Sequence, residues 1–147
     1  MQKLPLLSEH DIQAGFVAEV GYKYRLRGDF IPALFYAAVN GFWAAGEDRR
    51  RSALMGKYFA EGFRKGIPDI HYDQPRGPWT KLVIEFKRED MRGKKDGGLK
   101  KEQKEYLDAI EPYACIAVCY TADEAMAVFD RYMDLRIAIR PREDHHV

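Results

Sequence analysis

The sequence of 147 residues has no long apolar run, only two cysteines and a net charge of +1. A helix that spans a membrane needs about 20 consecutive apolar residues. A signal peptide needs a basic, an apolar and a small-residue region, which the start MQKLPLLSEHDIQ lacks. We therefore expect a soluble, intracellular protein that does not associate with a membrane.

The two cysteines, Cys115 and Cys119, lie four residues apart in one apolar run. Along a strand this offset exceeds the reach of a disulfide, so both are predicted to be buried small hydrophobic side chains. The sequence also lacks internal repeats and low-complexity segments. Its length and its 46% hydrophobic content predict one domain over residues 1–147, with a core at about 8–133 and a polar C-terminal tail.

The small net charge hides two basic segments. Residues 49–65 contain six basic side chains and one acidic side chain, and residues 87–104 contain eight basic and four acidic side chains. Each segment alone is typical of an ordinary solvated surface. Because both segments flank a group of carboxylates, we interpret them together as an indication that the ligand is a phosphate backbone.

Two helices are predicted in the first half of the chain. One covers about residues 9–20, with Ser8 as its N-cap, and the other begins at Ser52 and ends at Gly62 or Gly66. Between them, an apolar and aromatic stretch that is interrupted by glycines predicts a short strand or a turn.

The second half of the chain supplies most of the sheet. The runs IPDIHYD and KLVIEFKRE, separated by two prolines and a glycine, predict an antiparallel pair of strands. A helix over about residues 100–110, a buried strand CIAVCY and a last helix behind the capping box of Thr121 and Glu124 follow. The order helix, helix, strand, strand, helix, strand, helix predicts an α/β fold with a mixed central sheet flanked by helices.

The strand KLVIEFKRE carries the first candidate site residues. Alternation along a strand puts Glu85 and Lys87 on one face and Leu82, Ile84 and Phe86 on the other. A carboxylate and an ammonium group therefore converge on one place. Taken alone, such a pair is typical of a surface ion pair of little consequence.

Asp69, at the start of the preceding strand, adds a second carboxylate beside Glu85. Two adjacent carboxylates repel each other unless they share a cation. Mg²⁺ prefers hard oxygen ligands, needs only one or two carboxylates and takes its other ligands from water and phosphate. Lys87 would then stabilise the charge on a pentavalent phosphorus or orient the attacking water, so this set predicts hydrolysis of a phosphodiester.

Several short patterns resemble the VRR-NUC branch of the PD-(D/E)XK nuclease superfamily, in particular its short, stand-alone phage and bacterial members. They are residues 8–13 (SEHDIQ), Asn40-Gly41 followed by Arg49, Arg50 and Arg51, residues 66–70 (GIPDI), residues 84–88 (IEFKR), and a glycine-rich loop followed by Glu102-Gln103. The resemblance covers about residues 8–133. The sequence departs from the family where Lys100 and Lys101 replace a serine.

The resemblance implies a restriction-endonuclease-like core, DNA as substrate and Mg²⁺ as cofactor, with Mn²⁺ as a substitute. Carried over by position, it makes Glu9, Asp69 and Glu85 metal ligands, Lys87 the catalytic lysine, and Gln103 a catalytic-site residue that forms hydrogen bonds. It also implies the cytoplasm of a bacterial or phage-infected cell, branched DNA such as a four-way (Holliday) junction, and a homodimer that makes two cuts.

Basic side chains around the carboxylates are the candidates for DNA binding: Arg49, Arg50, Arg51, Arg64, Lys65, Arg88, Lys94 and Lys95. Glu61 is a rival to Glu9 as the third carboxylate. Two other functions remain open. One is a nucleic-acid-binding module of the same fold with weak catalysis, and the other is a phosphatase-like metal hydrolase that uses Asp69, His71 and Asp73.

Overall fold

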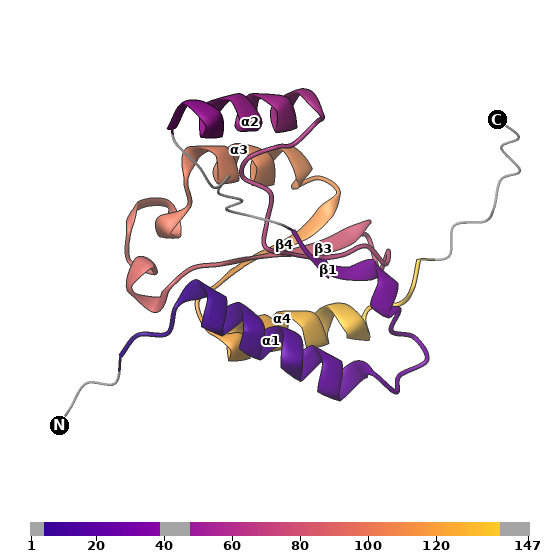
Figure 1. Ribbon diagram of the computed structural model, residues 1–147. Coiled ribbons are helices and arrows are strands. Elements are labelled where there is room, and N and C mark those ends of the chain that lie inside the picture. The colour runs from indigo at the N-terminus through magenta and orange to yellow at the C-terminus, as the bar shows by residue number, and fades with distance from the viewer. Residues whose placement is uncertain (1–4, 39–47, 139–147) are drawn as a thin grey trace, which may run out of the picture.

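The computed structural model describes residues 5–38 and 48–138 (Figure 1). Its main elements are α1 (Glu9–Tyr24), β1 (Phe35–Ala37), α2 (Asp48–Ala60), β2 (Ile70–Tyr72), β3 (Lys81–Phe86), α3 (Lys101–Ile110), β4 (Ala114–Cys119) and α4 (Ala122–Asp134). Short 3-10 helices cover Pro32–Leu34, Glu89–Met91 and Lys95–Gly98. Within the described ranges, no helix is long and apolar enough to cross a membrane. Asn40-Gly41 and the polar tail lie outside these ranges.

The four strands form one mixed sheet in the order β1-β2-β3-β4. β2 is antiparallel to β1 and to β3, with Ile70 opposite Ile84, which confirms the predicted antiparallel pair. β4 runs parallel to β3. A parallel neighbour needs a crossover connection, and α3 provides it. The predicted α/β fold with a mixed sheet flanked by helices is therefore confirmed.

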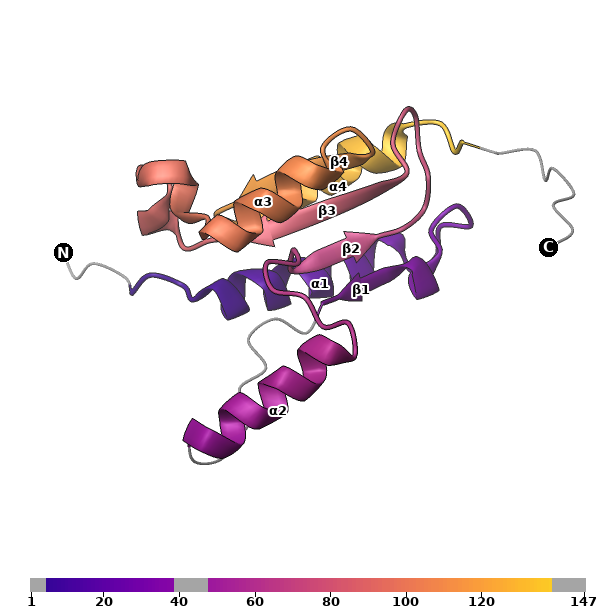
Figure 2. The same cartoon turned by 90° about the horizontal axis from the view of Figure 1, so that it is seen from above.

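Helices cover the two faces of this sheet differently. α1 and α4 pack side by side under one face, and α3 lies over the other face (Figure 1). The core lies on the α1 and α4 side, where Leu82, Ile84 and Phe86 of β3 meet the aromatic rings of both helices. Figure 2 shows α3 above β3 and β4, with α2 beyond the β1 edge of the sheet.

Two predicted helix boundaries are wrong. α1 continues to Tyr24 rather than ending near residue 20, because Ile12, Phe16, Val20 and Tyr24 form one buried stripe at four-residue spacing. α2 begins at Asp48, four residues before the predicted start. Ser8 and Thr121 are the N-caps of α1 and α4, as predicted, but the predicted reciprocal bond from the backbone N–H of Thr121 to Glu124 is replaced by one from Tyr120.

The capping groups follow ordinary hydrogen-bonding rules. Ser8 and Asp11 form a reciprocal capping box at the start of α1. At α4, the hydroxyl of Thr121 accepts a hydrogen bond from the backbone N–H of Glu124, whose carboxylate accepts from the backbone N–H of Tyr120. Both cysteines are free thiols, and Cys119 is buried as predicted, whereas Cys115 is only half-buried.

Arg76 holds the hairpin end of the sheet to the helices. Its guanidinium is buried and donates to the backbone oxygens of Met133 at 2.6 Å, Leu135 at 3.1 Å and Asp29 at 2.8 Å. It also donates to the side chain of Gln74 at 2.9 Å and to the carboxylate of Asp29 at 3.1 Å. One side chain therefore joins the β2–β3 hairpin, the end of α4 and the turn after α1.

Candidate active site

The predicted catalytic residues meet at the C-terminal end of β3. Asp69 directly precedes β2, Glu85 lies on β3, Lys87 follows β3, and Gln103 lies in the first turn of α3. Alternation along β3 turns Glu85 away from the core and toward α3, as the sequence predicted. The antiparallel pairing of β2 with β3 brings Asp69 level with the end of β3.

The carboxylate of Glu85 is at the centre of this group. Glu85 is 2% exposed and Lys87 is 5% exposed. Lys87 Nζ donates to Glu85 Oε1 at 2.5 Å, and Gln103 Nε2 donates to the same oxygen. The second oxygen, Oε2, is buried and has no hydrogen-bond partner among the described residues. Two donors thus hold one oxygen while the other is left unsatisfied, which is costly for a buried charged group.

Gln103 is fixed at both ends of its amide. Its Oε1 accepts from the backbone N–H of Lys100 at 2.9 Å, which satisfies one of the free donors at the start of α3. Because the amide oxygen is engaged there, the amide nitrogen faces Glu85. At Lys100 and Lys101, where the resembled family has a serine, Gln103 itself therefore caps the start of α3.

Asp69 binds the backbone of β3 at its C-terminal end. The β2–β3 pairing stops at Ile70 and Ile84, and beyond it Asp69 Oδ2 accepts from the backbone N–H of Phe86 at 2.8 Å. The side chain therefore replaces the next backbone acceptor of the ladder. The backbone oxygen of Asp69 accepts from the N–H of Ala38 at 2.9 Å, which ties the residue to the end of β1.

The electrostatics of the site favour a proton or a cation near Glu85. Burial is the largest cause that raises the pKa of Glu85 to about 7, and the negative charge of Asp69 raises it further. Lys87 lowers this pKa through its hydrogen bond and its charge, but does not cancel the effect. A bound cation would offset the buried negative charge that protonation otherwise removes.

Glu9, at the start of α1, is exposed, and its charge contributes to the raised pKa values of Glu85 and Arg88. Within residues 5–38 and 48–138, however, no three His, Cys, Asp or Glu side chains are close enough to form a ready metal cluster. The structure thus brings Asp69 and Glu85 together and leaves Glu9 as an electrostatic neighbour. Its rival Glu61 is exposed and lies 3.8 Å from Lys57.

Gly66 allows the segment before Asp69 to lie directly on α3. Its φ is +79°, and a Cβ atom there would lie 2.4 Å from the backbone oxygen of Glu102 and 2.8 Å from the backbone nitrogen of Gln103. Only glycine tolerates both the conformation and the contact. The sequence indicates Gly66 as a possible helix end and as part of the GIPDI pattern, but does not predict its contact with α3. The sequence did offer one indication of this role, since Gly66 lies three residues before Asp69.

Asp69, His71 and Asp73, the residues of the phosphatase-like alternative, do not form a metal cluster within the described part of the chain. The ring of His71 is buried, stacks on Tyr36 at 5.2 Å between centroids, and its Nε2 lies 3.1 Å from the backbone oxygen of Pro68. Asp73 accepts from the Tyr36 hydroxyl at 2.8 Å and lies 3.9 Å from Lys81 Nζ. Burial is the main cause that lowers the pKa of His71. These contacts are those of a packed strand.

The predicted phosphate contacts are exposed where the structure describes them, at Arg64, Lys65, Arg88, Lys94 and Lys95. Arg88 forms two hydrogen bonds with Asp90, at 3.0 and 2.6 Å. The backbones of Arg49, Arg50 and Arg51 lie in α2, but their side chains are outside the described residues.

The loop that carries Lys94 and Lys95 is held to the fold on both sides. The Tyr120 hydroxyl donates to the backbone oxygen of Gly97 at 2.9 Å, and the guanidinium of Arg92 lies 4.5 Å from the centre of the Tyr120 ring. Arg92 also donates to Glu89 at 2.8 Å and to Glu124 at 2.5 Å. The loop therefore holds its two lysines at a defined place after β3.

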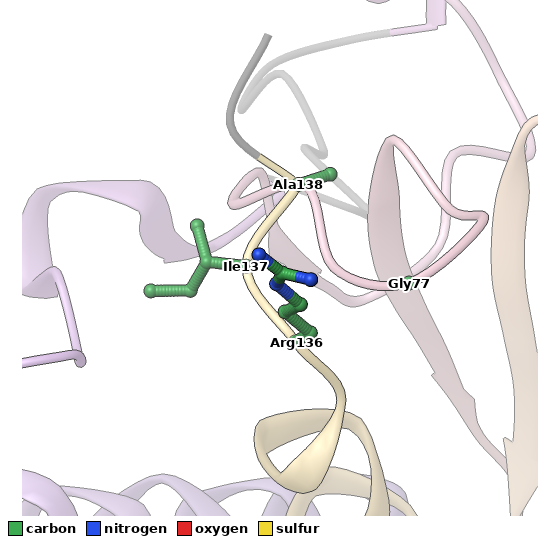
Figure 3. A pocket seen from close by; sticks show the side chains of 4 residues that line it. All are labelled: Gly77, Arg136, Ile137 and Ala138. Atoms are coloured by element: carbon green, nitrogen blue, oxygen red, sulfur yellow. The ribbon is translucent and has the colours of Figure 1, made fainter.

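A surface pocket of about 290 Å³ lies at the other end of the sheet (Figure 3). It is lined by Gly77, in the β2–β3 hairpin, and by Arg136, Ile137 and Ala138, after α4. The carboxylates of Asp69 and Glu85 lie at the opposite end of β3, so this pocket is not part of the candidate site.

Comparisons with known proteins support the fold. No family model matches the sequence, and no curated protein matches it. A solved structure described as a "VRR_NUC domain protein" matches with a TM-score of 0.68 and 22% identity, over 91% of this chain and 94% of that chain. The chain therefore has the fold of a VRR-NUC domain protein, as its sequence patterns predicted.

Proposed function

We propose that the protein is a metal-dependent endonuclease that hydrolyses phosphodiester bonds in DNA. The observation that carries the proposal is the buried carboxylate of Glu85, which has one oxygen held by Lys87 and Gln103 and the other oxygen without a partner among the described residues. Asp69 stands beside it. The shared fold with a VRR-NUC domain protein gives the proposal its reaction class.

The residues present fit a hard divalent cation. Two carboxylates, on buried Glu85 and half-buried Asp69, suit Mg²⁺, which takes its other ligands from water and phosphate, and Mn²⁺ accepts the same ligands. Asp69 and Glu85 would hold the ion, and Glu9 would add charge from α1. When bound, the ion supplies Lewis-acid polarisation of the phosphate and lowers the pKa of a water molecule.

The protein's own residues orient and neutralise the reacting groups. Lys87 brings a positive charge to a buried position 2.5 Å from Glu85, where it can stabilise the negative charge that develops on the phosphoryl oxygens. Gln103 holds the carboxylate of Glu85 in one orientation, and the backbone of Phe86 holds that of Asp69. The exposed side chains of Arg64, Lys65, Arg88, Lys94 and Lys95 would contact flanking phosphates.

We further propose branched DNA, such as a four-way junction, as a substrate of this site. A four-way junction is resolved by two symmetric cuts. A two-fold homodimer would place one copy of the site at each of the two cut positions. Support comes from the VRR-NUC patterns and from the two basic segments at residues 49–65 and 87–104.

The direct test uses labelled linear, flap and four-way DNA with and without Mg²⁺. Lys87→Ala is expected to lower the cleavage rate about 100-fold or more, as the loss of one charge-stabilising group does in other hydrolases. Lys81→Ala is the matched control, because Lys81 lies on the same strand and face but at the other end. It is expected to change the rate less than about twofold.

The metal assignment has its own test. Binding of Mn²⁺ to the free protein, followed by its electron paramagnetic resonance, is expected to weaken in Asp69→Asn and Glu85→Gln and to persist in Asp73→Asn. Cleavage by Lys87→Ala at the parent rate would overturn the mechanism. DNA binding without cleavage would favour a binding module. Hydrolysis of p-nitrophenyl phosphate that is lost only in His71→Ala would favour the phosphatase-like site.

A further inference from the structure

The helix α2 is the least packed helix of the described structure. None of its described side chains is buried, whereas each of α1, α3 and α4 buries at least one. α2 lies beyond the β1 edge of the sheet and on the same side as α3, which is also the side of the candidate site (Figures 1 and 2). Tertiary packing supplies most of the stability of a helix. A helix with no buried side chain among those described therefore suggests a role in binding rather than in the core.

The end of α2 builds an aromatic pair. Gly62, with φ +95°, ends the helix, and the backbone N–H groups of Gly62 and Phe63 donate to the oxygens of Phe59 at 3.1 Å and Tyr58 at 2.9 Å. This pattern is the Schellman motif. It folds Phe63 back onto Phe59, with 5.8 Å between ring centres, while Lys65 Nζ lies 5.4 Å from the centre of the Phe59 ring.

The apolar contact of a Schellman motif usually serves to end a helix, but here it leaves a large ring in solvent. Phe59 remains 40% exposed, and Arg64 and Lys65 beside it are exposed. The described side chains of residues 52–65 include three basic ones, Lys57, Arg64 and Lys65, and one acidic one, Glu61. That charge would repel the same surface of a second copy and attract a polyanion. The charge therefore favours a nucleic acid over self-association as the occupant.

The aromatic pair, with Lys65 beside it, and the candidate site belong to one short stretch of chain. Asp69 follows Lys65 by four positions in the chain, so their Cα atoms lie at most about 14 Å apart. That is the length of about four nucleotides at duplex spacing. Between them, Gly66 lies against the first turn of α3. The aromatic pair is thus tied to the same helix start that holds Gln103.

We propose that Phe59, Phe63 and Lys65 form a stacking platform for an unpaired nucleic-acid strand beside the carboxylates. The inference rests on the proposed function for its substrate. Bases in a duplex already stack on each other, whereas an unpaired base offers a free face to an aromatic ring, and a neighbouring lysine contacts its phosphate. The substrate class is therefore DNA with a single-stranded segment next to the cut.

The test is fluorescence anisotropy of the full chain in EDTA, with a labelled oligothymidine strand and a duplex of the same length as probes. Phe59→Ala is expected to weaken binding of the single strand about tenfold, which corresponds to the loss of one stacked base, and to change duplex binding less than about twofold. Lys65→Ala is expected to reduce the salt dependence of binding by about one released counterion.

Tyr22→Ala is the matched control. Tyr22 is 77% exposed on α1, and the guanidinium of Arg25 lies 5.5 Å from its ring centre, so it is also an exposed aromatic next to a cation, but on the other face of the sheet. It is expected to bind both probes like the parent. Phe59→Trp should bind the strand at least as well as the parent, and Phe59→Leu should resemble Phe59→Ala.

Three results would overturn the platform. They are parent-like strand binding by Phe59→Ala, parent-like binding by Phe59→Leu, and a dimer in sedimentation that Phe59→Ala dissociates while strand binding is unchanged. Failure of the proposed function looks different. A protein that binds the strand through Phe59 but cuts no DNA with Mg²⁺ would leave the platform standing and remove the nuclease.

Discussion

The two faces of the sheet serve opposite needs. On the α1 and α4 face, the ring of Phe129 lies 5.2 Å from Tyr24 and 5.4 Å from Tyr72, within a closed aromatic cluster. On the α3 face, Glu85 and Lys87 are as well buried, but one carboxylate oxygen has no partner among the described residues. Burial stabilises the first face and is costly on the second. Equal burial therefore does not mean equal contribution to stability.

The largest expected effect is on the aromatic face. Phe129→Ala removes a ring with several aromatic neighbours and leaves a cavity, so the free energy of unfolding is expected to fall by about 3–5 kcal/mol in urea titrations. The neighbours are Phe16, Tyr24, Phe30, Phe35 and Tyr72. The same change at exposed Phe59 should cost less than about 1 kcal/mol. Equal losses would erase the contrast between the regions.

The site face is expected to lose stability as pH rises. Because the pKa of Glu85 is raised from 4.5 to about 7 in the folded protein, the folded state holds a proton in that range which the unfolded state has released. Without divalent metal, the free energy of unfolding should therefore fall by up to about 3 kcal/mol between these pH values and then level off.

Glu85→Gln provides the comparison for this pH dependence. The variant carries no charge to bury, so this fall in unfolding free energy should be absent, and at pH 8 the variant should be more stable than the parent. Unfolding curves measured at a series of pH values in EDTA test it. A parent whose stability shows no such fall would mean that Glu85 is not a destabilising charge.

Arg76 shows that a buried charge can also stabilise when all its partners are present. Arg76→Met should lower the free energy of unfolding by about 3 kcal/mol, because the carbonyl oxygens of Met133 and Leu135 lose their donor. Arg27→Met, which breaks an exposed pair with Asp29, is the control and should cost less than about 1 kcal/mol. Chemical denaturation of both variants separates the two cases.

The smallest effect concerns the fit between the Asp69 segment and α3. Gly66→Ala forces the backbone of Glu102 away, so the hydrogen bond from Gln103 to Glu85 should weaken. DNA cleavage should then slow about tenfold, which corresponds to about 1.4 kcal/mol in the activation barrier. In Gly77→Ala the backbone is likewise strained at positive φ, but the new atom would meet only the side chain of Leu135, at 3.3 Å, at the far end of β3 from the candidate site. That control should cut within about twofold of the parent.

A second readout separates positioning from folding in this pair. The side-chain amide signals of Gln103 in nuclear magnetic resonance spectra should shift in Gly66→Ala and stay unchanged in Gly77→Ala. Equal rates in the two variants would show that the close contact at Gly66 does not position Gln103.

The sequence predicted those parts that depend on local pattern. Alternation in β3 correctly separated Glu85 from Leu82, Ile84 and Phe86, and the capping residues correctly placed the starts of α1 and α4. The extension of α1 to Tyr24 was missed because it depends on packing against α4. The four-residue spacing that runs from Ile12 to Tyr24 was visible in the sequence, but the contact with Phe129 of α4 that buries Tyr24 was not.

The candidate site was likewise predicted from the sequence only in part. Asp69, Glu85, Lys87 and Gln103 were identified from motif order, and the structure brings them together. The role of Gly66 was missed, because a contact between residues 66 and 102 is a matter of three-dimensional approach and not of spacing. Glu9 as a metal ligand, the cofactor and the DNA contacts stay predictions.

Phe86 connects the core with the candidate site. Its ring lies 5.6 Å from that of Phe16 in the core, while its backbone N–H donates to Asp69 Oδ2. The protein therefore contains a natural reporter: any ligand that redistributes charge on Asp69 must change the shielding of this one amide proton. Because the ring anchors the residue in a rigid interior, that signal would monitor loading of the site without any added label.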